Sequence, residues 1–289
     1  MRHRNAQQAA RTCVVLIAIV GMATVVVAQE KKEIPDHTGF KSCETCHADK
    51  QSMWEASGHS KSIGRVANSP QASADCYGCH STEGVIAKRE GQKVDLAAKA
   101  SFHSVSCLAC HEPRATAYPH KLALDPDKLC ESCHSQRIVL QGHGAKGIED
   151  IRSVHSEVAC ASCHMTRGDH SMKVLRPDDP NLAENRTDTC TACHRDGNRK
   201  ARAQQLQEWQ ADYKKSMDPL QADLTAVNAA LKDKPNLLSA ELKAKLDALK
   251  QNLFILQRDS SQGFHNPDFA SEVMTRAQKD LKEVQAALK

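Results

Sequence analysis

Cys43-Glu44-Thr45-Cys46-His47 is the first of six Cys-x-x-Cys-His motifs in this chain of 289 residues. The other motifs begin at Cys76, Cys107, Cys130, Cys160 and Cys190, so successive motifs start 23 to 33 residues apart. This pattern is typical of c-type haem attachment, in which two thiols bind the porphyrin and the adjacent histidine ligates the iron. The repetition therefore predicts six covalently bound haem c groups.

The predicted attachment residues form two sets. The cysteines that would bind the porphyrins are Cys43, Cys46, Cys76, Cys79, Cys107, Cys110, Cys130, Cys133, Cys160, Cys163, Cys190 and Cys193. The histidines that would ligate the irons from the adjacent position are His47, His80, His111, His134, His164 and His194.

Other uses of paired cysteines are less consistent with the pattern. A single CxxC pair could form a disulfide, a thioredoxin-like redox pair or half of a zinc site. Neither disulfides nor zinc sites require a histidine after each pair, yet every pair here has one. The one remaining cysteine, Cys13, lies in the N-terminal segment. We therefore favour haem attachment over metal clusters or a disulfide scaffold.

The N-terminal segment has the features of an export signal. Arg2, Arg4 and Arg11 precede an apolar run over residues 12–28, and the polar Gln29 follows Ala28. This order predicts a signal peptide over residues 1–28 and a periplasmic or otherwise extracytoplasmic protein. A run of about 17 residues is at the short limit for a membrane span, so an uncleaved N-terminal anchor is the alternative.

Composition constrains the middle of the chain. Residues 29–198 offer about 28 residues per predicted haem, and only 3% of all residues are aromatic. Because so little chain cannot build an ordinary apolar core around each cofactor, we expect the porphyrins to supply most of the interior of a hexahaem domain over 29–198. Without haem, this region should be unfolded or molten. The net charge of +4 does not suggest a nucleic-acid partner.

Residues 199–289 differ sharply, because cysteines stop and helical periodicity begins. Apolar residues recur at steps of three and four in a first predicted helix, which Pro219 should kink. The same periodicity resumes after a predicted turn at 233–236. Ser239 is the predicted N-cap of a second helix, and Asn266-Pro267-Asp268 would open a third. The apolar stripes comprise Leu206, Trp209, Tyr213, Met217, Leu220, Leu224, Val227 and Leu231, then Leu242, Leu246, Leu249, Leu253 and Leu256, then Phe269, Val273, Ala277, Leu281, Val284 and Leu288. We favour packing of these stripes on one another; the alternative is a homodimer through the C-terminal helices.

The supply of further histidines decides whether each iron can have a second axial ligand. The candidates are His37, His59, His103, His120, His143, His155, His170 and His265. If every iron has two histidines, none is open to substrate and the chain acts as an electron carrier. If one iron keeps an open position, the chain could be an enzyme.

Several stretches resemble the pentahaem, ammonia-forming cytochrome c nitrite reductases. Residues 154–165, with Asp169-His170 and the motif at 190–194, resemble the last two haem motifs of that family. Residues 262–267 are similar to its C-terminal helical region, and residues 107–113 to its second motif. The resemblance implies that His155, His170 and His265 are distal ligands, and that His59 is a further one.

The departures from that family concern its catalytic features. Its catalytic haem is attached through CxxCK, whereas the corresponding motif here ends in His80. Its catalytic tyrosine follows the third motif, where this chain has Ser135, Gln136 and Arg137. The octahaem hydroxylamine-oxidising proteins, which belong to the same broad group, keep histidine on some catalytic haems, so enzymatic function stays open.

We therefore expect a mainly α multihaem cytochrome c, with an irregular haem-packed region, a C-terminal long-helix hairpin and a third helix. Distal ligands are predicted at His59, His103, His120, His155, His170 and His265. The predicted function is electron transfer between redox proteins, or from a membrane quinol dehydrogenase. The alternative is a reductase of nitrite, hydroxylamine or a sulfur oxyanion at the haem of Cys76 and Cys79. In that enzyme His143 would donate protons, and Arg65 or Arg137 would bind the anion.

Overall fold

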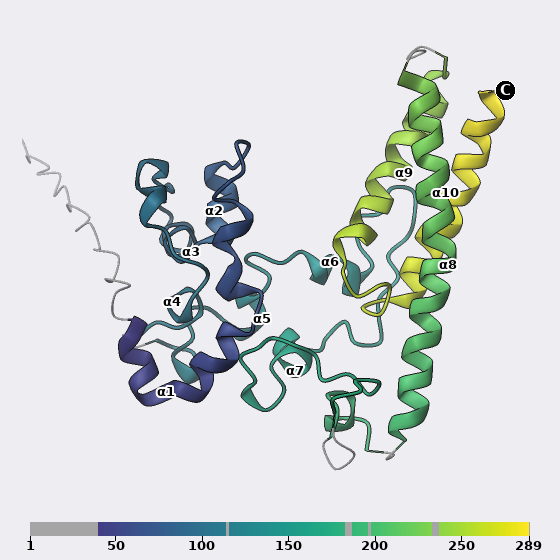
Figure 1. Cartoon of the computed structure of the whole chain (residues 1–289). Helices are drawn as coiled ribbons and strands as arrows, with labels where there is room; N and C mark the ends of the chain where they lie inside the picture. The colour runs from purple at the N-terminus through teal and green to yellow at the C-terminus, as the bar shows by residue number, and fades with distance from the viewer. Residues whose placement is uncertain (1–39, 114–115, 183–186, 196–197, 233–236, 289) are drawn as a thin grey trace, which may run out of the picture. The chain divides into compact units, whose positions relative to one another are not determined.

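The computed structural model describes residues 40–113, 116–182, 187–195, 198–232 and 237–288, all within one compact unit, Pro35–Lys289. Every regular element in these ranges is a helix (Figure 1), and their β pairing is limited to an isolated bridge between His111 and Leu122. The predicted mainly α fold class is thus confirmed. The predicted signal peptide or anchor and His37 lie outside the described residues.

The haem-motif region is built from short helices joined by irregular loops. Its α-helices are α1 (Phe40–Glu55), α2 (Ala74–His80), α3 (Thr82–Arg89), α4 (Cys107–Cys110), α5 (Pro126–Leu129), α6 (Gln136–Gln141) and α7 (Cys160–His164). Its 3₁₀ helices are η2 (His59–Lys61), η3 (Ile63–Arg65), η4 (Leu96–Ser101), η5 (Pro119–Lys121), η6 (Thr166–Gly168) and η7 (Cys190–Ala192). Because residues three apart share one side of a helical turn, the two cysteines of a motif that lies in a helix fall on the same side, as attachment to one porphyrin would require.

The C-terminal region consists of three long helices: α8 (Arg199–Lys232), α9 (Ala240–Arg258) and α10 (Pro267–Ala287). Most residues of their predicted apolar stripes pack on one another in a shared core, in which Leu253, Val273 and Val284 are at most 1% exposed. Leu206 and Trp209 of the first stripe lie outside this core cluster, and Trp209 is 37% exposed. α8 continues as one helix across Pro219, where the sequence predicted a kink. The predicted turn at 233–236 lies outside the described residues.

Both predicted helix starts are confirmed. Ser239 Oγ accepts the backbone N–H of Leu242 at the start of α9, with an N–O distance of 3.3 Å. Asn266 Oδ1 likewise accepts the N–H of Phe269 at 3.1 Å, and Pro267 occupies the first turn of α10. Such caps satisfy N–H groups that have no partner within the helix.

The loop that follows the fourth motif joins the two regions. Val139 of α6 is 2% exposed and belongs to the same core cluster as the long helices. Asn266 donates through Nδ2 to the carbonyls of Val139 and Ile151, at 3.0 and 2.5 Å. The side chain of Asn252 on α9 accepts the N–H of Lys146 at 2.6 Å and donates to its carbonyl at 3.0 Å. Residues 136–151 therefore pack against the C-terminal helices.

Candidate haem-binding sites

Four histidines of the motifs each face a second histidine ring from elsewhere in the chain. His134 lies opposite His59 with ring centroids 5.9 Å apart, and His194 lies opposite His155 at 6.1 Å. The pairs His111 with His170 and His164 with His265 both have centroids 6.2 Å apart. The paired histidines are 39 to 101 residues apart in sequence, so the tertiary fold creates the pairs.

These separations fit one metal ion held between two imidazoles. A bond between an imidazole nitrogen and a transition metal is about 2 Å long, so the two ligating nitrogens lie roughly 4 Å apart. Adding the distance from each nitrogen to its ring centre gives centroids roughly 6 Å apart. The four observed separations, 5.9 to 6.2 Å, agree with this arrangement.

Hydrogen bonds orient several of the paired rings. His111 Nδ1 lies 2.9 Å from the carbonyl of His120, and His170 Nδ1 lies 2.9 Å from that of Gly168. His164 Nδ1 lies 3.2 Å from the carbonyl of Met172. Because a carbonyl can only accept, Nδ1 must carry the proton, which leaves Nε2 free to ligate a metal.

The three acceptor carbonyls share an unusual backbone conformation. His120, Met172 and Gly168 have φ angles of 54°, 56° and 72°, in the left-handed region. For residues other than glycine this conformation costs energy, so the surrounding fold must hold it in place. Here it belongs to the residues whose carbonyls accept from the paired histidines.

Burial keeps several of these histidines in the form that binds metal. Burial, reinforced by neighbouring positive groups, lowers the pKa of His59, His111, His134 and His155 below the usual value. A lowered pKa favours the neutral imidazole, and only a neutral imidazole has a nitrogen lone pair for a metal.

The remaining predicted distal ligands occupy other surroundings. His103 Nδ1 bonds Glu83 Oε1 at 2.6 Å, and His143 Nδ1 bonds Asp150 Oδ2 at 2.7 Å. Within the described ranges, the rings of His143 and His120 face no histidine of a motif. His103 and His120 as distal ligands, and His143 as a proton donor, therefore stay predictions.

The first and second motifs differ from the other four. Among the residues that the structure describes, no second histidine ring is found opposite His47 or His80 at the separation seen elsewhere. His80 Nδ1 is buried and has no hydrogen-bond partner among the described residues. Of the two arginines considered as anion ligands, Arg65 is exposed. Arg137 donates to Glu131 Oε1 at 2.6 Å and to the carbonyl of Ser156 at 2.7 Å.

Thiols of different motifs lie close enough to perturb one another. Burial, and then the neighbouring Cys133 thiol, raises the pKa of Cys110 to about 11. A shared hydrogen bond with Cys160 raises the pKa of Cys130. Similar interactions join Cys43 with Cys107, Cys79 with Cys133, and Cys163 with Cys193. The third to sixth motifs thus form a continuous series of neighbours, with the first motif beside the third and the second beside the fourth.

Sequence reasoning missed the groups that orient the paired rings. Three are backbone carbonyls, which every residue has, so no sequence signal marks them. The fourth is Asp259, which lies six residues before His265 and bonds its Nδ1. A carboxylate close to a candidate ligand was the available signal, although its sequence spacing alone does not establish contact.

Comparison with known proteins finds similarity to c-type cytochromes. Family models match three parts of the chain: "Cytochrome c552" over residues 150–289, "Doubled CXXCH motif" over residues 100–138, and "Cytochrome c554 and c-prime" over residues 42–112. A search of curated proteins finds no match.

Two solved structures resemble the fold. The outer cell wall cytochrome OcwA is 27% identical with a TM-score of 0.67, over 80% of this chain and 50% of that one. An undecahaem cytochrome from the S-layer of Carboxydothermus ferrireducens is 20% identical with a TM-score of 0.55, over 78% of this chain and 40% of that one. This chain therefore spans half or less of the length of these relatives.

The motifs, the helical fold and these matches together identify a multihaem c-type cytochrome that binds haem covalently through CxxCH motifs. None of the helices in the described part of the chain is long and apolar enough to cross a membrane.

Proposed function

We propose that this chain is an exported hexahaem cytochrome that passes single electrons between redox partners. The observation that carries the proposal is the set of four opposed histidine pairs, because two axial histidines leave an iron no open position for substrate. The haems supply one-electron chemistry, and the chain supplies axial ligands and fixed positions. Export agrees with the cell-wall and S-layer sources of the two similar structures.

The contacts between motifs suggest the path. The main line runs through the third, fourth, fifth and sixth motifs, with the first motif beside the third. The second motif branches from the fourth. Electrons would therefore enter and leave near the ends of this series, at the first, second or sixth motif, through a redox protein or a membrane quinol dehydrogenase.

Single substitutions of the four distal histidines test the ligand assignment. His59→Ala, His155→Ala, His170→Ala and His265→Ala should each convert one low-spin haem to a high-spin haem in the oxidised protein. Low-temperature EPR measures the change, and haem content by pyridine haemochrome should stay at six per chain. The matched control is His143→Ala, which removes a histidine that faces no motif histidine among the described residues. Unchanged spectra in all four variants would refute the assignment.

A second candidate function rests on the second motif, where His80 faces no second histidine ring within the described part of the chain. An open haem there would reduce nitrite, hydroxylamine or a sulfur oxyanion, with proton donors nearby. The wild-type oxidised protein should then show a high-spin signal that nitrite, hydroxylamine or cyanide alters. Purely low-spin spectra, unchanged by these ligands, would exclude it.

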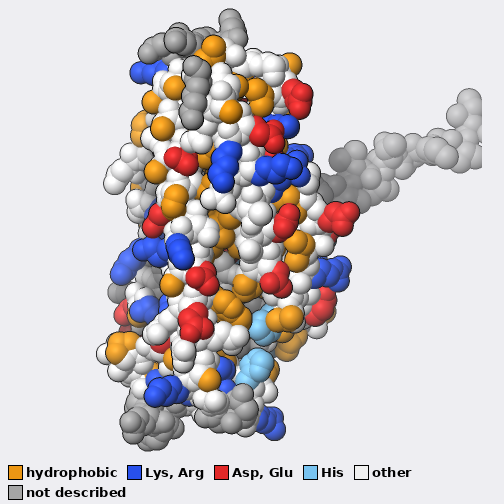
Figure 2. Space-filling view, turned by 90° about the vertical axis from the view of Figure 1, so that its right-hand side faces the viewer, with side chains coloured by type: hydrophobic (Ala, Val, Ile, Leu, Met, Phe, Trp, Pro, Cys, Tyr) orange, Lys and Arg blue, Asp and Glu red, His pale blue; other side chains and the backbone are white. Residues whose placement is uncertain are grey.

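A homodimer through α8, α9 and α10 is the alternative to packing of these helices within one chain, and the contacts favour packing within one chain. Most residues of the predicted apolar stripes already lie inside the three-helix core. On the face shown in Figure 2, hydrophobic side chains are interspersed with charged ones of both signs. Analytical ultracentrifugation of the full chain at micromolar concentration would distinguish a dimer from a monomer.

A further inference from the structure

One of the four opposed pairs contains a histidine that is bonded to a carboxylate. His265 Nδ1 lies 2.5 Å from Asp259 Oδ1, whereas His111, His164 and His170 bond backbone carbonyls at 2.9 to 3.2 Å. Asp259 is buried, with its side chain 1% exposed. The pair formed by His164 and His265 thus has a distinct electrostatic environment.

The end of α9 holds this carboxylate in place. The N–H of Asp259 bonds the carbonyl of Leu256 at 3.1 Å, which ends the helix. Ser261 Oγ donates to Asp259 Oδ2 at 2.6 Å and accepts the N–H of His265 at 3.0 Å. Gly263 permits the chain reversal in between, since its φ is 82° and a Cβ there would lie 2.8 Å from the ring of Tyr213.

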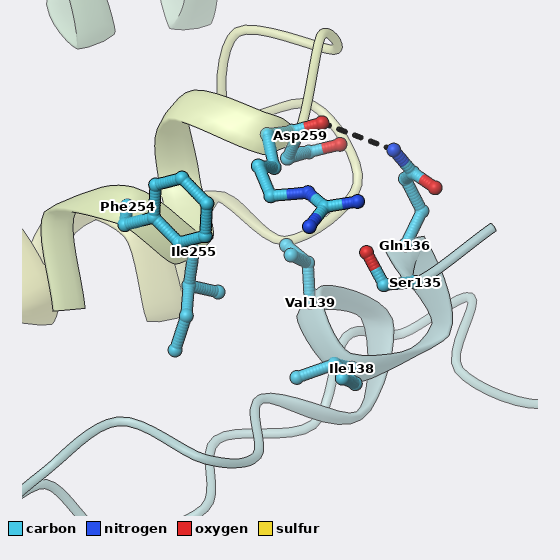
Figure 3. A pocket seen from close by; sticks show the side chains of 8 residues that line it. Ser135, Gln136, Ile138, Val139, Phe254, Ile255 and Asp259 are labelled. Atoms are coloured by element: carbon cyan, nitrogen blue, oxygen red, sulfur yellow. Dashed lines mark hydrogen bonds between the residues drawn. The ribbon is translucent and has the colours of Figure 1, made fainter. Parts of the chain in front are cut away.

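The surroundings of Asp259 leave its negative charge directed at His265. Within the described residues, Asp259 forms no ion pair with a lysine or arginine. The neighbouring Gln136 of α6 bonds the carbonyl of Arg258 rather than the carboxylate (Figure 3). Burial, and then the charge of Asp259, raises the pKa of Tyr213 to about 12, so this neighbour is neutral. The low dielectric of a buried site strengthens the remaining interaction with the imidazole.

A buried carboxylate that accepts the Nδ1 proton makes the imidazole a more electron-rich ligand. An electron-rich ligand stabilises ferric iron over ferrous iron, so it lowers the reduction potential. A backbone carbonyl, which has no net charge, does this more weakly. We propose that Asp259 is a positioning residue that makes the haem of Cys160 and Cys163 the hardest to reduce of the four haems with opposed histidines. This inference rests on the proposed ligation of that haem by His164 and His265.

Asp259→Asn is the test, because asparagine keeps the shape of the side chain and removes its charge. In the full haem-loaded protein, potentiometric titration followed by EPR should show one midpoint potential shifted upward, with the others unchanged. The same haem should show a larger spread of its low-spin g values toward high gmax, since its axial imidazole carries less negative charge. Glu at the same position supplies a second variant: Asp259→Glu retains a carboxylate and should stay closer to wild type than Asp259→Asn.

Two further variants make the outcome decisive. His265→Ala identifies the signal of this haem, because that signal alone should turn high-spin. If His265→Ala changes nothing, the proposed ligation fails; if it does change this signal while Asp259→Asn leaves every potential and g value unchanged, only the present inference fails. Asp150→Asn is the matched control, since it removes a carboxylate bonded to His143. A shift of the same haem by Asp150→Asn, equal to that of Asp259→Asn, would also overturn the inference.

Discussion

The two regions of this chain achieve a stable fold by different means. Residues 199–288 bury a continuous cluster of leucine, valine, alanine and phenylalanine side chains contributed by three long helices. Residues 40–198 bury only scattered apolar side chains of their own, such as Val66, Ile86 and Val105, in the described ranges. The first arrangement stabilises itself through the hydrophobic effect, whereas we expect the second to need the apolar area of its haems.

Removing the haems should have the largest effect, and it should unfold the haem-motif region while leaving the C-terminal helices folded. A full chain with all twelve motif cysteines replaced by serine cannot bind haem covalently. We expect residues 40–135 and 152–198 to exchange their amide hydrogens nearly as fast as an unfolded chain, while α9 and α10 stay protected. Hydrogen exchange with mass spectrometry, on this variant and the haem-loaded protein, measures the difference. Strong protection throughout the motif region of the variant would show that its polypeptide folds unaided.

A cavity in the C-terminal core should lower the stability of the C-terminal helical region. Leu253→Ala removes a side chain that is 1% exposed, and such substitutions cost about 2–5 kcal/mol. Denaturant unfolding followed by far-UV circular dichroism measures the loss, and the haem absorption spectrum should be unchanged in the absence of denaturant. The neighbouring Phe254→Ala is the matched control, because Phe254 is 55% exposed and its loss should cost below about 1 kcal/mol. Equal costs for the two substitutions would contradict the described core.

A pair of helix-cap variants tests the link between the two regions. Asn266→Ala removes a helix cap and two hydrogen bonds to the loop after α6, together about 3 kcal/mol. Ser239→Ala removes only a cap, worth about 1 kcal/mol. The larger loss for Asn266→Ala should be accompanied by faster amide exchange over residues 139–151. Similar costs, with no change in exchange there, would mean that Asn266 acts only as a cap.

Much of this molecule was predictable because the signals are local. The CxxCH spacing is a covalent requirement of one cofactor, so each motif identifies its own porphyrin-binding residues. The helical stripes and the caps at Ser239 and Asn266 are likewise local consequences of a 3.6-residue period and unpaired N–H groups. Four of the six histidines predicted as distal ligands, His59, His155, His170 and His265, do face a motif histidine.

The pairing itself belongs to the tertiary structure. His265 meets His164 across 101 residues, and nothing in the spacing of either residue specifies that partner. The orienting carbonyls of His120 and Met172 depend on left-handed backbone angles that only the packed chain can impose. The sequence by itself determined which cofactor is bound and which segments are helical, since both depend on neighbouring residues. Only the folded chain decided which histidines face one another, since those contacts join residues that are distant in sequence.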